Sequence, residues 1–131
     1  MCATMEREQV LTIFTVDDSE IIYKNMSTWL TPNKHVKWLG HAFSVPDAYK
    51  QISTQNPQLV ILDIQLKADS SFELLQYIHK QHPHTEVIMF TNHSTEPYRK
   101  KCKEFGAKYF LDKSTEFEKI PQILNELLQS N

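Results

Sequence analysis

The chain has 131 residues and a formal net charge of −2, and 40% of its residues are hydrophobic and 23% charged. This length suits one domain with one hydrophobic core. The nearly neutral charge gives no whole-molecule attraction to nucleic acid or anionic membranes, and no stretch approaches the ~20 apolar residues that a membrane-spanning helix needs.

The N-terminal segment MCATMEREQ carries charges where a secretion signal needs an apolar core. We therefore expect residues 1–9 to be a tail, residues 10–131 to be the domain, and the protein to be cytoplasmic. Cys2 and Cys102 are far apart in the sequence, which favours reduced thiols in that compartment.

Segments rich in β-branched and aromatic residues alternate with amphipathic helical segments along the chain. The predicted strands cover residues 10–16, 35–43, 58–64, 86–91 and 107–112. The predicted helices cover residues 19–30, 44–57, 71–83, 96–106 and 115–129. Strict alternation of strand and helix predicts a parallel sheet with helices on both faces.

Several local signals mark the ends of these helices. Ser44 is a candidate N-cap for the second helix, and Ser19 suits the first turn of the first helix. Gly106 is a C-terminal stop signal, and Pro121 predicts that the regular part of the last helix begins late. The register of strand 35–43 stays open, because its bulky residues do not alternate: Val36, Trp38 and His41.

Polar side chains follow four of the predicted strands. In chain order they are Asp17 and Asp18, then Asp63, Thr91 and Lys113. The carboxyl ends of parallel strands meet at one edge of the sheet, where such folds bind their ligands. We therefore expect three carboxylates, a hydroxyl and an ammonium to share one pocket.

This set of groups suits a particular chemistry. Three close carboxylates repel one another unless a cation lies among them, and oxygen-only ligands suit Mg²⁺. An Asp beside Mg²⁺ can act as a nucleophile and accept a phosphoryl group, while Lys113 neutralises charge and Thr91 donates to a phosphoryl oxygen. A single Asp after a strand is commonly a turn residue, so the prediction rests on the joint pattern.

The motifs TVDDSE, LVILDIQL, FELLQYI, IMFTN and GAKYFLDKS together resemble the receiver domain of bacterial two-component response regulators, over roughly residues 10–129. The resemblance implies an α/β, flavodoxin-like (βα)5 fold, a doubly wound parallel five-stranded sheet in the order 2-1-3-4-5.

The resemblance also implies roles for individual residues. Asp63 would be the phosphoacceptor and would bind Mg²⁺ together with Asp18 and the backbone carbonyl of Gln65. Asp17 would assist through water, and Lys113 would pair with the phosphoryl group. Thr91 and Phe110 would form the switch pair.

The function implied is a Mg²⁺-dependent phosphorylation switch rather than an enzyme with a separate substrate. A sensor histidine kinase or a histidine phosphotransfer protein would supply the phosphoryl group from a phosphohistidine. The output would be a downstream protein partner or a homodimer, formed through residues 96–129. The cationic run RKKCK at 99–103 is expected to be solvated surface, so no direct nucleic-acid binding is expected.

Alternatives and departures from the family pattern stay open. The chain could be the receiver fragment of a longer DNA-binding response regulator. An aspartyl-nucleophile phosphatase usually has a second Asp two residues after the first, and Gln65 stands there instead. Asn92 and Ser114 replace a small residue and a proline of the family, so Asn92 could restrict access to Asp63 and Ser114 could cap the last helix.

Overall fold

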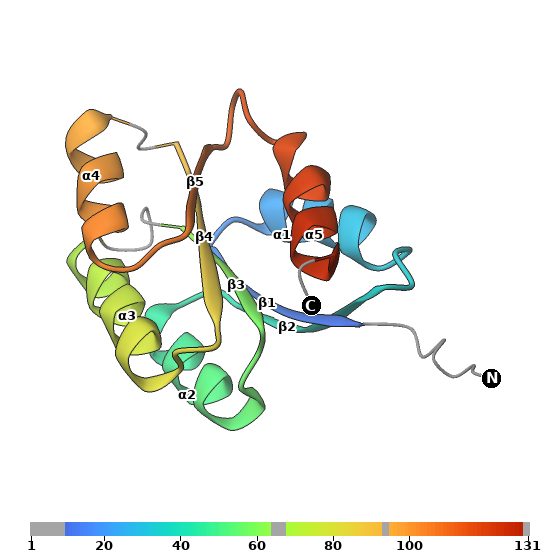
Figure 1. Cartoon of the computed structure of the whole chain (residues 1–131), viewed down its shortest axis with the longest axis horizontal. Helices are drawn as coiled ribbons and strands as arrows, with labels where there is room; N and C mark the ends of the chain where they lie inside the picture. The colour runs from blue at the N-terminus through green and yellow to red at the C-terminus, as the bar shows by residue number, and fades with distance from the viewer. Residues whose placement is uncertain (1–9, 64–67, 93–94, 130–131) are drawn as a thin grey trace.

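The structure is a computed structural model that describes residues 10–63, 68–92 and 95–129, in which strands and helices alternate (Figure 1). The strands are β1 Leu11–Val16, β2 Val36–Ala42, β3 Leu59–Leu62, β4 Glu86–Thr91 and β5 Tyr109–Asp112. The helices are α1 Glu20–Leu30, α2 Val45–Gln55, α3 Ala68–Gln81, α4 Glu96–Glu104 and α5 Lys119–Gln129. None of the helices in these ranges has the length and apolar character that crossing a membrane requires.

The strands form one parallel sheet in the order β2-β1-β3-β4-β5, which confirms the predicted flavodoxin-like fold. Helices α1 and α5 cover one face of the sheet, and α2, α3 and α4 cover the other (Figure 1). The strand that follows β1 in the sequence, β2, lies on one side of it, and the later strands lie on the other side. The carboxyl ends of the adjacent strands β1 and β3 therefore lie at the switch in strand order, where such folds bind ligands.

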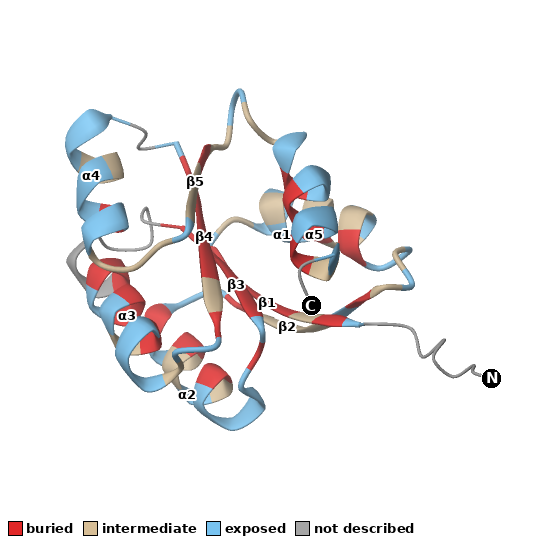
Figure 2. Cartoon of the chain, in the orientation of Figure 1, coloured by how far each residue is buried: buried red, intermediate tan, exposed pale blue. Residues whose placement is uncertain are grey.

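The middle of the sheet is buried on both faces, as Figure 2 shows. In β3, Leu59 and Ile61 pack toward α1 and α5, while Val60 and Leu62 pack toward the other three helices. Because both faces are covered, every position of the strand is apolar, and the first polar side chain after it is Asp63.

Strand β2 carries a bulge that the sequence did not reveal. Trp38 pairs with Ile13, and His41 pairs with Thr15. The segment of β2 between these pairs therefore has one residue more than the segment of β1 opposite it, and Leu39 is that extra residue. Successive side chains of a regular strand alternate between faces. The bulge therefore brings Trp38 and His41 to the same face, which settles the register that the sequence left open.

Most of the predicted helix ends are confirmed. The hydroxyls of Ser19 and Ser44 accept hydrogen bonds from the first turns of α1 and α2. Gly106 follows the end of α4 with φ of +110°, and a Cβ there would lie 2.5 Å from the ring of His79, so a glycine suits this position.

Two helices begin three or four residues away from their predicted starts. Helix α3 begins at Ala68 rather than at residue 71. Helix α5 begins at Lys119 rather than at 115, with Pro121 in its first turn as expected. The expectation that Ser114 caps this helix is wrong, because Ser114 lies in a turn where its N–H donates to Asp112 Oδ1 at 2.7 Å.

Candidate functional site

The predicted strand-end residues meet at one edge of the sheet. Asp17, Asp63 and Lys113 directly follow β1, β3 and β5, and each donates its backbone N–H to a carbonyl of a neighbouring strand at 3.0 or 3.1 Å. The ladder of the sheet thus continues past the assigned strands and fixes the backbone of all three residues.

Three carboxylates gather here. Oxygen atoms of Asp17, Asp18 and Asp63 all lie within 4.8 Å of one another. The first and third of these residues are each 1% exposed, whereas Asp18 is exposed to solvent. The set offers only hard oxygen ligands and an open side, which fits Mg²⁺, a cation that keeps several of its waters.

Lys113 is the cation inside this cluster. Its Nζ atom lies 2.7 Å from Asp17 Oδ2 and 3.0 Å from Asp63 Oδ2, and its side chain is only 7% exposed. One ammonium faces three carboxylates, so the cluster keeps an excess of negative charge. A further cation would compensate that excess.

The pKa values of the buried groups reflect this balance. Burial raises the pKa of Asp17, the nearby Asp63 charge raises it further, and the hydrogen bond from Lys113 only partly offsets them. Burial by itself would lower the pKa of Lys113, but its hydrogen bonds and ion pairs with the two carboxylates outweigh burial and raise it. Lys113 is therefore charged at neutral pH.

Asp17 has further contacts that the sequence did not predict. Its Oδ1 accepts from the backbone N–H of Ser19 at 2.9 Å, and its carbonyl oxygen lies 2.8 Å from His41 Nε2. Burial lowers the pKa of His41, with the Asp17 carbonyl opposing that shift. A histidine on a strand gives no local sign of such a contact, which depends on how β2 pairs with β1.

Of the remaining predicted site residues, Thr91 comes from β4, which lies between the strands that precede Asp63 and Lys113. Thr91 ends β4 and is fully buried. The two departures from the family pattern are partners of one another, since Ser114 Oγ donates to Asn92 Oδ1 at 3.0 Å. Gln65, the predicted backbone ligand, lies outside the described residues.

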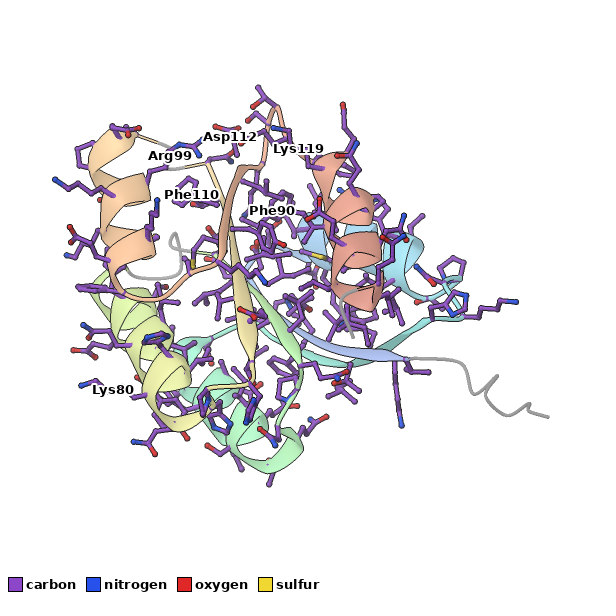
Figure 3. The ribbon with its side chains drawn as sticks, viewed as in Figure 1. Lys80, Phe90, Arg99, Phe110, Asp112 and Lys119 are labelled. Carbon is purple, nitrogen blue, oxygen red and sulfur yellow. The ribbon has the colours of Figure 1, made fainter. Side chains whose placement is uncertain are left out.

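Phe110 lies on β5, partly buried, and Arg99 of α4 covers it (Figure 3). The guanidinium carbon is 4.7 Å from the centre of the ring, and Nη1 donates to the Phe110 carbonyl at 3.5 Å. The ring thus packs against the core on one side and against a cation on the other.

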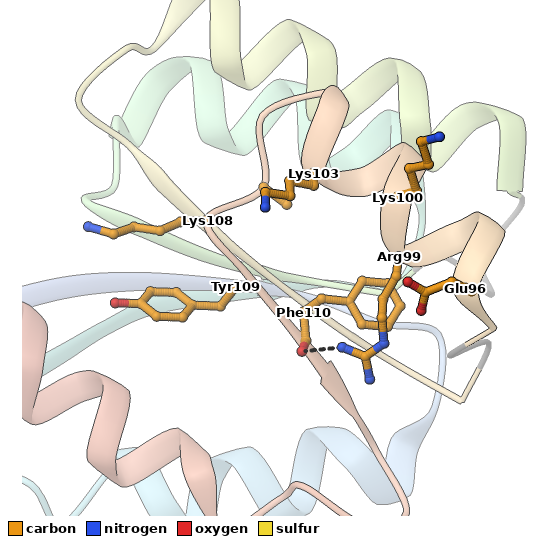
Figure 4. Close-up of a pocket in the computed structure, with 8 residues that line it drawn as sticks. Glu96, Arg99, Lys100, Lys103, Lys108, Tyr109 and Phe110 are labelled. Carbon is orange, nitrogen blue, oxygen red and sulfur yellow. Dashed lines mark hydrogen bonds between the residues drawn. The ribbon is translucent and has the colours of Figure 1, made fainter.

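Between α4 and β5 lies a groove of about 520 Å³, which Figure 4 shows. We call it the basic groove, because most of its charged lining residues are cations. The lining comprises Glu96, Arg99, Lys100, Lys103, Ala107, Lys108, Tyr109 and Phe110.

Comparisons with known proteins agree with this geometry. The family model for the response regulator receiver domain matches residues 13–125. The sensory transduction protein LytT of Bacillus cereus is 27% identical over 117 residues, which cover 89% of this chain and 47% of LytT. The chain spans about half the length of the first curated relatives it matches.

Two solved structures show the same fold. The signal receiver domain of NarL from Mycobacterium tuberculosis has a TM-score of 0.82 at 16% identity, covering 94% of this chain and 99% of that chain. The isolated receiver domain of RcsB from Salmonella enterica serovar Typhimurium, in the presence of the phosphomimetic BeF3−, has a TM-score of 0.83 at 15% identity, with 92% and 90% covered.

Proposed function

We propose that this chain, which belongs to the response regulator receiver domains, accepts a phosphoryl group on Asp63 and thereby switches a protein-binding surface. The observation that carries the proposal is the buried Asp63 carboxylate, 3.0 Å from a buried lysine and clustered with two further carboxylates. A buried carboxylate in such company is a candidate nucleophile rather than a solvated turn residue.

The transfer itself needs few groups. An Asp63 oxygen attacks the phosphorus of a phosphohistidine, the P–N bond breaks, and its electron pair stays on the leaving imidazole. Lys113 remains beside the acceptor and neutralises charge on the transferred group, while the Thr91 hydroxyl donates to a phosphoryl oxygen. A sensor histidine kinase or a histidine phosphotransfer protein in the cytoplasm would be the donor.

Mg²⁺ is the proposed cofactor. Asp18 and Asp63 would hold it directly, Asp17 through water, and Gln65 through its backbone carbonyl. When bound, the ion supplies positive charge next to the phosphoryl oxygens. Both carboxylate oxygens of Asp17 already have partners, Oδ2 with Lys113 at 2.7 Å and Oδ1 with the Ser19 N–H at 2.9 Å, which supports its indirect role.

Labelling with a small phosphodonor tests the acceptor. With Mg²⁺ and acetyl phosphate, the protein should gain one phosphoryl group that hydroxylamine removes, and Asp63→Asn should gain none. Asp112→Asn is the matched control, because Asp112 also ends a strand but lies outside the carboxylate cluster. Labelling that persists in Asp63→Asn would disprove the assignment.

The output surface is proposed to include the basic groove and the face of residues 96–129. A homodimer through this face needs free acidic groups opposite the groove lysines. Glu116 is bound to Arg99 and Lys119, and Glu126 accepts from the Tyr109 hydroxyl at 3.3 Å. Within the described residues, Lys100 and Lys103 make no ion pair. A separate partner with acidic groups suits these lysines, and so does a second copy through its exposed Glu118.

Sedimentation with and without beryllofluoride separates the two outputs. A protein that stays monomeric at high concentration in both states supports the separate partner. A beryllofluoride-dependent dimer that Lys103→Glu abolishes would establish the homodimer instead. A dimer that this charge reversal leaves unchanged would place the interface on another face.

A longer regulator is the second proposal, favoured by the coverage of only 47% of LytT. The chain would then be the receiver part, and the output would pass to a further domain. Reading the gene beyond both ends of the 131 residues distinguishes this arrangement from a stand-alone switch.

A further inference from the structure

A chain of hydrogen bonds connects an indole at the edge of the sheet to the backbone of the acidic site. The Trp38 Nε1–H donates to Thr15 Oγ1 at 3.1 Å, and the same oxygen lies 2.6 Å from His41 Nδ1. The other ring nitrogen, Nε2, lies 2.8 Å from the carbonyl oxygen of Asp17. This series of hydrogen bonds ends at the carbonyl group of Asp17, which is bonded to the backbone nitrogen of Asp18.

The acceptors determine which atoms in this series of hydrogen bonds carry the protons. A carbonyl oxygen only accepts, so His41 Nε2 must carry a proton. The Thr15 oxygen accepts from the indole, and its own proton has two acceptors in reach: His41 Nδ1 at 2.6 Å and, farther away, the Gly40 carbonyl at 3.4 Å. Every donor faces an acceptor when the ring is neutral and protonated on Nε2.

The bulge in β2 makes the chain possible. Trp38 and His41 are three residues apart and would face opposite sides of a regular strand. With Leu39 as the extra residue, both reach the fully buried Thr15 on β1.

Packing holds the His41 ring from its sides as well. Its centroid lies 5.0 Å from that of Tyr23 on α1 and 4.4 Å from that of Phe43, which follows β2. Both ring nitrogens and the flanking surfaces of the ring therefore have partners. A side chain fixed in this way can in turn fix the group that it binds.

The group that it binds is the peptide leading to Asp18. The N–H of Asp17 donates to the Ala42 carbonyl at 3.0 Å, which fixes one side of the residue. The plane of the next peptide is fixed where its carbonyl accepts from His41. Rotation of that plane would swing Asp18 relative to Asp63, because the carbonyl carbon is bonded to the Asp18 nitrogen.

We propose that His41 is a positioning residue, which holds the peptide between Asp17 and Asp18 so that the Asp18 carboxylate is preset for a divalent cation. The inference rests on the cation site of the proposed function. His41 itself touches neither the cation nor the phosphoryl group in this role.

Variants of His41 and one neighbour test the inference. His41→Phe keeps an aromatic ring against Tyr23 and Phe43 but loses the donor, whereas an amide nitrogen of His41→Gln can replace Nε2. Phe43→Leu is the control, since it disturbs the same ring packing and leaves the donor intact. Nitrogen NMR of the wild-type imidazole reports the proton on Nε2 directly, without metal or phosphodonor.

Mg²⁺ affinity is then measured by titration, followed through the amide signal of Asp18. His41→Phe should weaken binding by about tenfold, a usual loss when a hydrogen-bond partner that holds a ligand residue in place is removed. His41→Gln should recover most of that loss, and Phe43→Leu should bind like the wild type. Thermal melting of each variant shows whether it is folded.

The outcomes distinguish a failure of the positioning role of His41 from a failure of the cation site. A proton on Nδ1 alone, or a His41→Phe protein that binds Mg²⁺ as the wild type does, would refute the positioning role. If His41→Phe does not fold, His41→Gln and the imidazole spectrum decide. A wild-type protein that binds no Mg²⁺ would refute the cation site itself, and the position of the imidazole proton would still test the bond to Asp17.

Discussion

The acidic cluster and the basic groove are both charged, but they hold their charges in opposite ways. In the cluster, Lys113 is 7% exposed and lies 2.7 and 3.0 Å from two buried carboxylates. Around the groove, the pair of Arg99 with Glu116 spans 3.5 Å and that of Lys108 with Glu86 spans 3.6 Å, with side chains 21% to 45% exposed. The first arrangement holds its charges buried and in contact, and the second leaves its charges accessible to solvent.

Strand β5 connects the two regions. Lys113 of the cluster directly follows it, and Phe110 of the groove lies within it, under the Arg99 guanidinium. In the proposed switch, Thr91 moves toward a new phosphoryl group on Asp63, and the Phe110 ring turns into the space it leaves. Such a change would have to break the contact of the ring with Arg99, so a small rearrangement at the cluster would reshape the groove.

The largest expected effect separates the two kinds of ion pair. Lys113→Met leaves two buried carboxylates without their cation and should lower the free energy of unfolding by about 3 kcal/mol in the absence of metal. The control, Lys119→Met, removes an ion pair from a side chain that is 54% exposed and should cost less than about 1 kcal/mol. Urea unfolding measures both, and equal losses would contradict the contrast between the two regions.

Magnesium should act on the cluster alone. At a concentration ten times its dissociation constant, Mg²⁺ should stabilise the fold by about 1.4 kcal/mol through mass action. Asp18→Ala should lose most of that stabilisation and Asp17→Ala less, while Asp47→Ala, on α2, should lose none. Thermal melting with and without Mg²⁺ tests this, and an unchanged shift in both site variants would place the metal elsewhere.

A smaller effect concerns acid stability at the start of α5. The hydrogen bond from Lys119, then that from the Asp112 N–H, hold the pKa of Glu116 below its ordinary value of 4.5. A carboxylate with a lower pKa in the folded state adds stability above its unfolded pKa and loses it as pH falls through the folded value. Glu116→Gln should therefore cost about 0.5 kcal/mol at neutral pH and flatten the loss of stability below pH 4.5.

Urea unfolding from neutral to acidic pH measures this difference. Glu118→Gln is the matched control, because Glu118 is exposed and precedes the same helix. Identical acid profiles for the two variants would mean that the contacts of Glu116 do not contribute.

The smallest effect is expected in the basic groove. Lys100→Ala and Lys103→Ala should each change the free energy of unfolding by less than about 0.5 kcal/mol, because both side chains are exposed. Labelling of Asp63 by acetyl phosphate should also be unchanged. A clear loss of stability or of labelling in either variant would show that the groove is not a separate partner surface.

Much of the site could be predicted because strand ends are local features. The apolar run of β3 identifies a doubly covered strand, and the residue after it must lie at the carboxyl edge of a parallel sheet. The same reasoning placed Asp17 and Lys113 at this edge of the sheet. In the structure, Lys113 Nζ lies 2.7 Å from Asp17 Oδ2 and 3.0 Å from Asp63 Oδ2. Helix starts were harder, since α5 begins after a turn that Asp112 stabilises through its side chain.

The sequence by itself determined the order of strands and helices, the two-faced burial of the sheet and the convergence of Asp17, Asp63 and Lys113, because each follows from neighbouring residues and from the rules of parallel sheets. Only the tertiary structure decided the bulge at Leu39, the contact of His41 with Asp17 and the pairing of Asn92 with Ser114. These features depend on how residues 22 to 26 positions apart in the sequence meet in the fold. The residue pattern of one strand does not show how many residues lie opposite it on the neighbouring strand.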